Sequence, residues 1–186
     1  MSYAYQEIVE KTVLEDHDLK LVTPLELSMA KDIAKGANDP LISKMIGSHT
    51  FPFPYTEEDA VFFIDMNRMD GKTPFTIDFA IYFKDRFAGI IGLKDINNTD
   101  RKAHVGYWIS REFRNMGIAS SSLRLVIDYS RDSLHLHRLY TGAFTDNPAS
   151  IRVLTRCGFQ VEGIARDDMI IDGNYRDMMQ FGLILQ

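Results

Sequence analysis

The residues in this sequence best placed to do chemistry stand around Gly117, between a predicted strand and a predicted helix. Residues 103–109 alternate in the period-2 pattern of a strand, and residues 118–127 place apolar side chains at helical spacing. The small residues after Gly117 leave the start of the helix open. The first N–H groups of a helix lack intrahelical partners, and its N-terminus carries partial positive charge. The segment therefore predicts an anion site, above all for phosphate.

The elements that must position this site follow from the same patterns. Alternating apolar residues predict strands at 19–22, 77–83, 87–95, 103–109, 138–144, 159–164 and 178–185. Capping residues and helical spacing predict helices from Thr23–Pro24 to Gly36, from Thr56 to about Met69, from Gly117 onward and from Asn147 to Gly158. The antiparallel run before Gly117 excludes a Rossmann-type fold, whose glycine motif follows an early parallel strand. We expect a single α/β domain over residues 1–186, without repeats or linkers.

Residues 37–55 lack a regular pattern and are predicted to form a loop. Prolines alternate with aromatic residues there, and proline disfavours both helices and sheet ladders. Long loops in compact domains are often functional. Phe51, Phe53 and Tyr55 are therefore predicted to form a wall of an acceptor site; the alternative is a loop that is merely packed on the core.

Composition limits the classes of function. The 186 residues are 45% hydrophobic and 25% charged, as in an ordinary globular protein, and the net charge of −5 lacks the basic footprint of nucleic-acid binding. The sequence has no membrane-length apolar run, and its opening residues lack the pattern of a secretory signal. Cys157 is the single cysteine, and His135 and His137 have no further ligand nearby, so no metal site is predicted. We expect a cytoplasmic protein that binds neither nucleic acid nor membranes.

The segment Arg114-Asn115-Met116-Gly117-Ile118-Ala119 has the form Arg-x-x-Gly-x-Ala. With GYWI before it, and with the segments 145–150, 157–159 and 162–163 after it, the chain resembles the GNAT superfamily of acetyl-CoA-dependent N-acetyltransferases. Within that superfamily it is similar to the Rim-type branch, which acetylates ribosomal-protein N-termini. The resemblance runs from about Phe87 to the C-terminus and is weaker before it. It implies a central, mostly antiparallel mixed sheet in which two strands splay apart for the pantetheine arm of acetyl-CoA, flanked by helices.

The resemblance also implies which residues bind the cofactor. Backbone N–H groups of Asn115, Gly117, Ile118 and Ala119 would hold the pyrophosphate, in a turn that Arg114 and Met116 complete. Ile109 would pair its backbone with pantetheine, and Asn147 would hydrogen-bond the same arm. An asparagine at that position is equally explained as a plain helix N-cap.

The chain departs from its relatives at the catalytic positions. Many GNAT enzymes have a tyrosine acid where Leu154 stands, whereas Rim-type relatives have a serine that corresponds to Ser150, which we therefore expect to be the general acid. The glutamate base of those relatives falls at Met169, beside Asp168. Another branch has a glutamate base on the strand before the phosphate loop, and His104 holds that place with an ordinary pKa near 6.5. The base is therefore His104, Asp168 or a chain of water molecules.

These comparisons of motifs predict an N-acetyltransferase that moves an acetyl group from acetyl-CoA to a primary amine by direct attack on the thioester. The expected acceptor is a protein N-terminal α-amino group. A small amine, such as a polyamine or an aminoglycoside, is the alternative acceptor. A regulator that binds acyl-CoA without catalysis is the alternative outside the enzyme class. No metal is expected, and a homodimer is left open.

Overall fold

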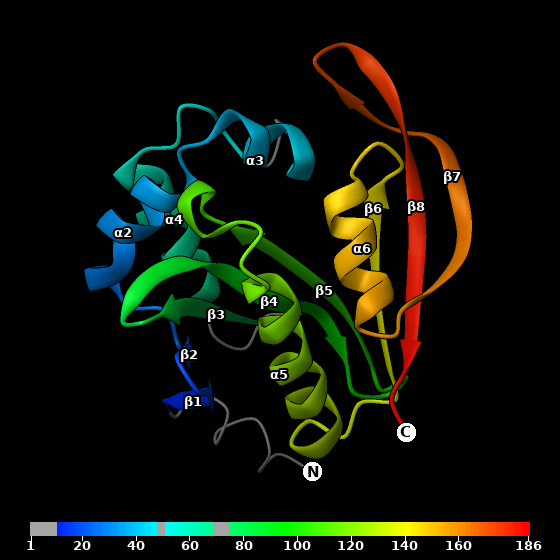
Figure 1. Cartoon of the computed structure of the whole chain (residues 1–186), viewed down its shortest axis with the longest axis horizontal. Helices are drawn as coiled ribbons and strands as arrows, with labels where there is room; N and C mark the ends of the chain where they lie inside the picture. Colours follow the sequence, from blue (N-terminus) through cyan, green and yellow to red (C-terminus); the bar gives the residue numbers. More distant parts are fainter. Residues whose placement is uncertain (1–10, 48–50, 69–74) are drawn as a thin grey trace.

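Residues 11–47, 51–68 and 75–186 are described by the computed structural model and build one eight-stranded sheet (Figure 1). The strand order is β1-β2-β3-β4-β5-β6-β8-β7, and every neighbouring pair is antiparallel except β5 and β6. The mostly antiparallel mixed sheet predicted above is thereby confirmed. The strands are β1 (Thr12–Asp16), β2 (Leu19–Thr23), β3 (Phe75–Phe83), β4 (Arg86–Asn97), β5 (Lys102–Ile109), β6 (Arg138–Phe144), β7 (Gln160–Ile171) and β8 (Asn174–Ile184).

Helices cover both faces of the sheet (Figure 1). One face buries its alternate apolar side chains, such as Phe79 and Ile91, against α5 and α6. The opposite face packs Ala80 and Ile90 against α2 and α4. None of the described helices has the length and apolar character that a bilayer crossing requires. The helices are η1 (Leu27–Met29), α2 (Ala30–Ala37), α3 (Pro40–Ile46), α4 (Glu57–Arg68), η2 (Arg111–Phe113), α5 (Ile118–Asp132) and α6 (Pro148–Arg156).

Local capping signals located two of these helices correctly. Before α4, the Asp59 N–H donates to Thr56 Oγ1 at 3.2 Å and the Thr56 N–H donates to Asp59 Oδ2 at 2.8 Å, a reciprocal capping arrangement. Before α6, the Asn147 side chain accepts a hydrogen bond from the Ser150 N–H, and Pro148 takes the first helical position. The predicted end of α4 at Met69 and the opening residues 1–10 lie outside the described residues.

The predicted start of the first helix at Thr23–Pro24 was wrong, although helical structure does reach the predicted end near Gly36. Thr23 is the last residue of β2 and pairs with Thr12 of β1, a strand that the sequence patterns did not reveal. Helical structure starts only at η1, and α2 then runs one residue past Gly36. Gly36 is needed for a close approach, because a Cβ there would overlap the Ser110 hydroxyl and lie 2.9 Å from the Phe87 ring.

The predicted loop at 37–55 contains a helix. Asp39 caps α3 by accepting a hydrogen bond from the Leu41 N–H at 2.9 Å, and Pro40 occupies the first turn. The closing strands β7 and β8 are also longer than the predicted 159–164 and 178–185. Their extra length forms an extended hairpin, which Figure 1 shows rising beside α6.

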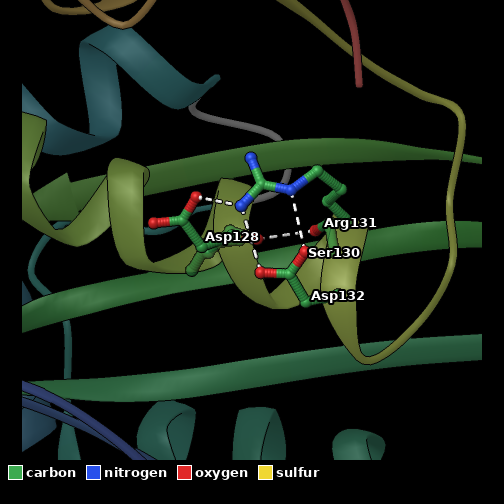
Figure 2. A network of polar contacts seen from close by, with 5 residues as sticks. Asp128, Ser130, Arg131 and Asp132 are labelled. Carbon is green, nitrogen blue, oxygen red and sulfur yellow. Dashed lines mark hydrogen bonds and ion pairs between the residues drawn. The ribbon is translucent and has the colours of Figure 1, made fainter. Parts of the chain in front are cut away.

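The two ends of α5 have different surroundings. At its C-terminal end, Arg131 contacts Asp128 and Asp132, each at 2.8 Å, and Ser130 Oγ donates to the Val126 carbonyl at 2.7 Å (Figure 2). A cation there complements the helix dipole, but these exposed pairs add little stability. The N-terminal end, at Gly117, faces the site described next.

Candidate active site

The parallel pair β5–β6 opens a cleft through the sheet. The two strands pair only at Lys102–Arg138, Ala103–Leu139 and His104–Tyr140. Beyond His104, both continue without pairing to each other, and Figure 1 shows them diverging. Between them lies a cleft of about 1250 Å³ that residues of both strands, α3, α4, α5, α6 and the β7–β8 hairpin line. A strand that loses its neighbour offers unpaired backbone groups to an extended ligand.

The N-terminus of α5 forms one end of the cleft. Gly117 caps the helix with φ of 81°, a left-handed conformation that favours glycine, and a Cβ built on it meets nothing within 4 Å. The first bond of this turn is donated by the Ser121 N–H to the Gly117 carbonyl at 3.0 Å. The N–H groups of Ile118, Ala119 and Ser120 precede it and belong to the first helical turn, whose donors need partners outside the helix. These donors and the open space beside Gly117 fit a phosphate group.

Arg114 holds this turn in place through its side chain. Its Nε donates to the Ile109 carbonyl at 3.1 Å, and its Nη2 lies 2.9 Å from Asp39 Oδ2. Both side chains of this ion pair are largely buried, and Asp39 also caps α3. The guanidinium therefore connects the end of β5 to α3, and the backbone N–H groups of the turn are the donors that fit a phosphate.

The other predicted cofactor residues are brought to the same cleft with one exception. Ile109, Asn115, Ile118, Ala119 and Asn147 all line it. Met116 belongs to the turn, but its side chain is 53% exposed and does not line the cleft. The Asn147 side chain makes the N-cap bond, accepting from the Ser150 N–H at 3.2 Å.

Ser150, the predicted acid, lies in the first turn of α6 and is paired with a tyrosine. The hydroxyl of Tyr107, on β5, is 2.9 Å from Ser150 Oγ, and either group can be the donor. Burial raises the pKa of Tyr107 to about 12, and the hydrogen bond with Ser150 only partly offsets this effect. The phenol therefore stays protonated at neutral pH and can supply a proton to the Ser150 hydroxyl.

His104, one candidate base, stands where β5 and β6 separate. Its ring packs edge-on against Tyr140, with centroids 5.5 Å apart, and it lines the cleft. Burial lowers the pKa of His104, the charge of neighbouring Lys94 lowers it further, and Asp95 opposes these effects. The imidazole is therefore neutral at physiological pH and can accept a proton.

Asp168, the other candidate base, is differently placed. It is exposed on β7, in the irregular stretch between Ala165 and Met169 where the register with β8 shifts. It lines the cleft from the side of the hairpin. No hydrogen bond joins the described side chains of Asp168 and either His104 or Ser150.

The predicted aromatic wall is present in part. Phe51 stacks on Tyr55, with centroids 4.7 Å apart, and meets Trp108 at 6.1 Å. All three line the cleft, whereas Phe53 is 52% exposed and does not. The Tyr55 hydroxyl donates to the Asp59 carbonyl at 3.4 Å, and burial raises its pKa to about 12.

Several lining residues were missed by sequence reasoning. Tyr107 belongs to the alternating pattern of residues 103–109, which predicts a strand and does not indicate that its hydroxyl is a usable proton donor. Arg152 and Arg156 of α6 also line the cleft and add positive charge beside the start of α5. Their spacing of four residues places them on one helix face, a signal that was available in the sequence. Over the described ranges, no cluster of three or more histidine, cysteine or acidic side chains could hold a metal.

The chain is similar to several acetyltransferases of known sequence or structure. Among solved structures, the RimL ribosomal L7/L12 α-N-protein acetyltransferase in complex with coenzyme A superimposes with a TM-score of 0.83 at 20% identity, over 94% of this chain and 98% of that one. A ribosomal-protein-serine acetyltransferase from Escherichia coli K12 is 28% identical, over 72% of this chain and 74% of the relative. A spermidine N(1)-acetyltransferase from the same strain is 32% identical, over 50% of this chain and 50% of the relative.

The aligned regions differ in extent. YdaF of Bacillus subtilis (strain 168) is 33% identical over 108 residues, which make up 58% of this chain and 59% of YdaF. The chain thus spans about half to three fifths of several curated relatives that it matches. The profile of the acetyltransferase (GNAT) domain matches residues 20–160, from β2 to the first residue of β7. The chain therefore belongs to the GNAT family of acetyltransferases.

Proposed function

We propose that this protein transfers the acetyl group of acetyl-CoA to a primary amine, and that the acceptor is a protein N-terminal α-amino group. The observation that carries the proposal is the cleft between β5 and β6. One end of it has open space beside Gly117 and the first N–H groups of α5, and its walls carry the Tyr107–Ser150 pair and His104.

The binding role of each element follows from its donors and charges. The N–H groups at the start of α5 suit the diphosphate of acetyl-CoA, and Arg152 and Arg156 add charge that attracts phosphate. The pantetheine arm would lie along the part of β5 that β6 no longer pairs, from residue 105 to Ile109. This path leads from the α5 N-terminus toward His104, which puts the thioester near the candidate acid and base.

The reaction removes two protons from the acceptor nitrogen and adds one proton to the CoA sulfur. The ammonium form of the acceptor loses its first proton to His104, or to water or Asp168 in its place, and the free amine nitrogen attacks the thioester carbonyl carbon. The C–N bond forms and the C–S bond breaks, the nitrogen gives its second proton to water, and the thiolate of CoA takes a proton from Ser150 Oγ. Tyr107, which is protonated before the reaction, then gives a proton to that oxygen, and water returns a proton to the phenolate.

A polyamine is the second candidate acceptor. It is favoured by the E. coli spermidine N(1)-acetyltransferase, a relative at 32% identity over half of this chain, and by the acidic net charge of −5, which attracts cations. The two acceptors share a primary amine and differ in the number and spacing of positive charges.

A release assay tests the proposal. Purified protein is incubated with acetyl-CoA and, separately, with a serine-initiated N-terminal peptide, spermidine or an aminoglycoside, and free CoA thiol is measured over time. We expect the peptide to give the highest kcat/KM. A higher value for spermidine would move the assignment to the polyamine. Binding of acetyl-CoA without thiol release on any acceptor would identify a non-catalytic acyl-CoA-binding regulator instead.

A further inference from the structure

Three strands place one row of paired residues across the floor of the cleft. Asp78 of β3 pairs with Gly92 of β4, and Gly92 pairs with Gly106 of β5. Directly paired residues project their side chains to the same face of a sheet. That face is the one covered by α2 and α4. Ala80 and Ile90 lie two residues from Asp78 and Gly92 on the same strands, so they share their face, and both belong to the buried cluster on that side.

Asp78 projects its carboxylate over the first glycine of this row. Asp78 is 5% exposed and lines the cleft. A Cβ on Gly92 would overlap the carboxylate, so the missing side chain is what lets Asp78 lean toward β5. A carboxylate at the wall of a cleft can bind a cationic group through a charge-assisted hydrogen bond.

His104 borders the same floor from the opposite side. The ring atom Cε1, between the two ring nitrogens, lies 3.7 Å from the position that a Cβ on Gly106 would occupy. Gly92 and Gly106 are direct partners, and such partners have Cβ positions about 4.5–5.5 Å apart. The two glycines therefore leave a gap, about one strand spacing wide, between a carboxylate and a neutral imidazole.

We propose that Asp78 is the residue that binds the ammonium group of the acceptor, which lies on the Gly92–Gly106 floor between Asp78 and His104. This inference rests on the proposed acetyl transfer and adds to it the group that selects the substrate. The site takes primary amines that are protonated in solution and gives no binding advantage to neutral nucleophiles of the same size.

The arrangement also explains why the substrate is bound more tightly than the product. The ammonium group arrives with a positive charge that the carboxylate attracts, and it gives one proton to the imidazole before the C–N bond forms. The product is a neutral amide, so the attraction to Asp78 is lost once the acetyl group has been transferred. Substrate is thereby favoured over product at the same position.

Among the described residues, the charged and titratable groups near His104 come from β3, β4 and β6. Lys94 and Asp95 lie on β4, Tyr140 packs from β6, and Asp78 stands across the floor on β3. Lys94 pairs with His104 and lies outside the glycine row. Its positive charge opposes a second ammonium group on its side, so the acceptor's reacting nitrogen is directed toward Asp78.

Two substitutions test the role of Asp78, and a third is a control. Asp78→Asn keeps the shape and removes the charge. Gly106→Ala adds one methyl group at ordinary contact distance from His104, so the protein should fold while the floor is filled. Gly163→Ala, on β7 with nothing within 4 Å of the added Cβ, is the matched control. Kinetics with the serine-initiated peptide and with spermidine are combined with acetyl-CoA affinity by calorimetry and with melting curves.

We expect Asp78→Asn and Gly106→Ala each to raise the acceptor KM by about tenfold or more, because a charge-assisted hydrogen bond is lost or its place is filled. Acetyl-CoA affinity should be unchanged in Asp78→Asn, and Gly163→Ala should behave as wild type. An unchanged acceptor KM in a folded, active Asp78→Asn protein would overturn the inference and leave the proposed acetyl transfer standing. A wild type that releases no CoA with any amine would overturn both.

Discussion

The hydroxyl groups of Tyr107 and Ser150 lie 2.9 Å apart, although the residues come from β5 and α6 and are 43 positions apart in the sequence. The contact crosses the mouth of the cleft where the β5–β6 pairing has ended. The contact pairs a tyrosine that is protonated at neutral pH with the serine that we propose as the general acid.

Ser150→Ala should lower kcat by about 100-fold or more, because general acid catalysis contributes on that order. The Ser150 N–H that bonds Asn147 is retained, so α6 should keep its cap. Tyr107→Phe should give a smaller loss. Steady-state kinetics with saturating acetyl-CoA measure both effects, and calorimetry checks that acetyl-CoA still binds. Thr155→Ala, which removes another α6 hydroxyl, one that donates to the Ile151 carbonyl, is the control. An unchanged kcat in Ser150→Ala would remove the serine from the mechanism.

Gly117→Val should weaken acetyl-CoA binding by more than tenfold, about 1.4 kcal/mol. The valine would fill the open space beside the α5 N–H groups and would also strain a backbone with φ of 81°. Gly173→Val separates these effects, because Gly173 has a φ of 77° and equally open surroundings but lies in the turn between β7 and β8. Calorimetric titration with acetyl-CoA should show a loss for Gly117→Val alone. Equal affinities in both folded variants would exclude the phosphate cradle.

The pH dependence of kcat/KM should identify the base. His104 accepts a proton only when neutral, so the rate should fall as pH decreases through its pKa, which burial and Lys94 place below the ordinary value. Lys94→Gln removes a charge that lowers this pKa and should therefore move the acidic limb to higher pH. His104→Ala should abolish the limb. A pH profile that neither substitution alters would assign the base to Asp168 or to water.

Substitution of the aromatic residues near α4 should show whether they bind the acceptor or only pack against the rest of the protein. Phe51→Ala should raise the acceptor KM by about tenfold, because it removes a ring that contacts both Tyr55 and Trp108 at the cleft wall. Phe53→Ala, at an exposed position outside the cleft, should change nothing. Kinetics with each acceptor are paired with melting curves. A lower melting temperature with an unchanged acceptor KM would make Phe51 a packing residue only.

Local signals in the sequence were enough to place the start of α5, the end of the site where we propose that phosphate binds. Gly117 and the apolar spacing after it located the start of α5, and Thr56 and Asn147 located two other helices, because a cap is a property of a few adjacent residues. Thr23–Pro24 carried the same kind of signal and was misleading. There, pairing of β2 with β1 and β3 outweighed the local preference.

Features that depend on strand register could not be predicted in the same way. The closeness of Tyr107 to Ser150 follows from where β6 leaves β5, which no local pattern records. Asp78 stands in an apolar strand, and its importance appears only when pairing aligns it with Gly92 and Gly106. Similarly, α3 was hidden among prolines and aromatic residues, although Asp39 and Pro40 are a regular helix start.

The most direct test of the account measures both products of one reaction. Wild-type protein is incubated with acetyl-CoA and the serine-initiated peptide, and free CoA thiol is compared with acetylated peptide by mass spectrometry. The account predicts equal amounts of the two products, acetylation at the α-amino nitrogen, and parallel loss of both in Gly117→Val at limiting acetyl-CoA. Thiol release without acetylated peptide, or acetyl-CoA binding with neither product on any amine, would contradict it.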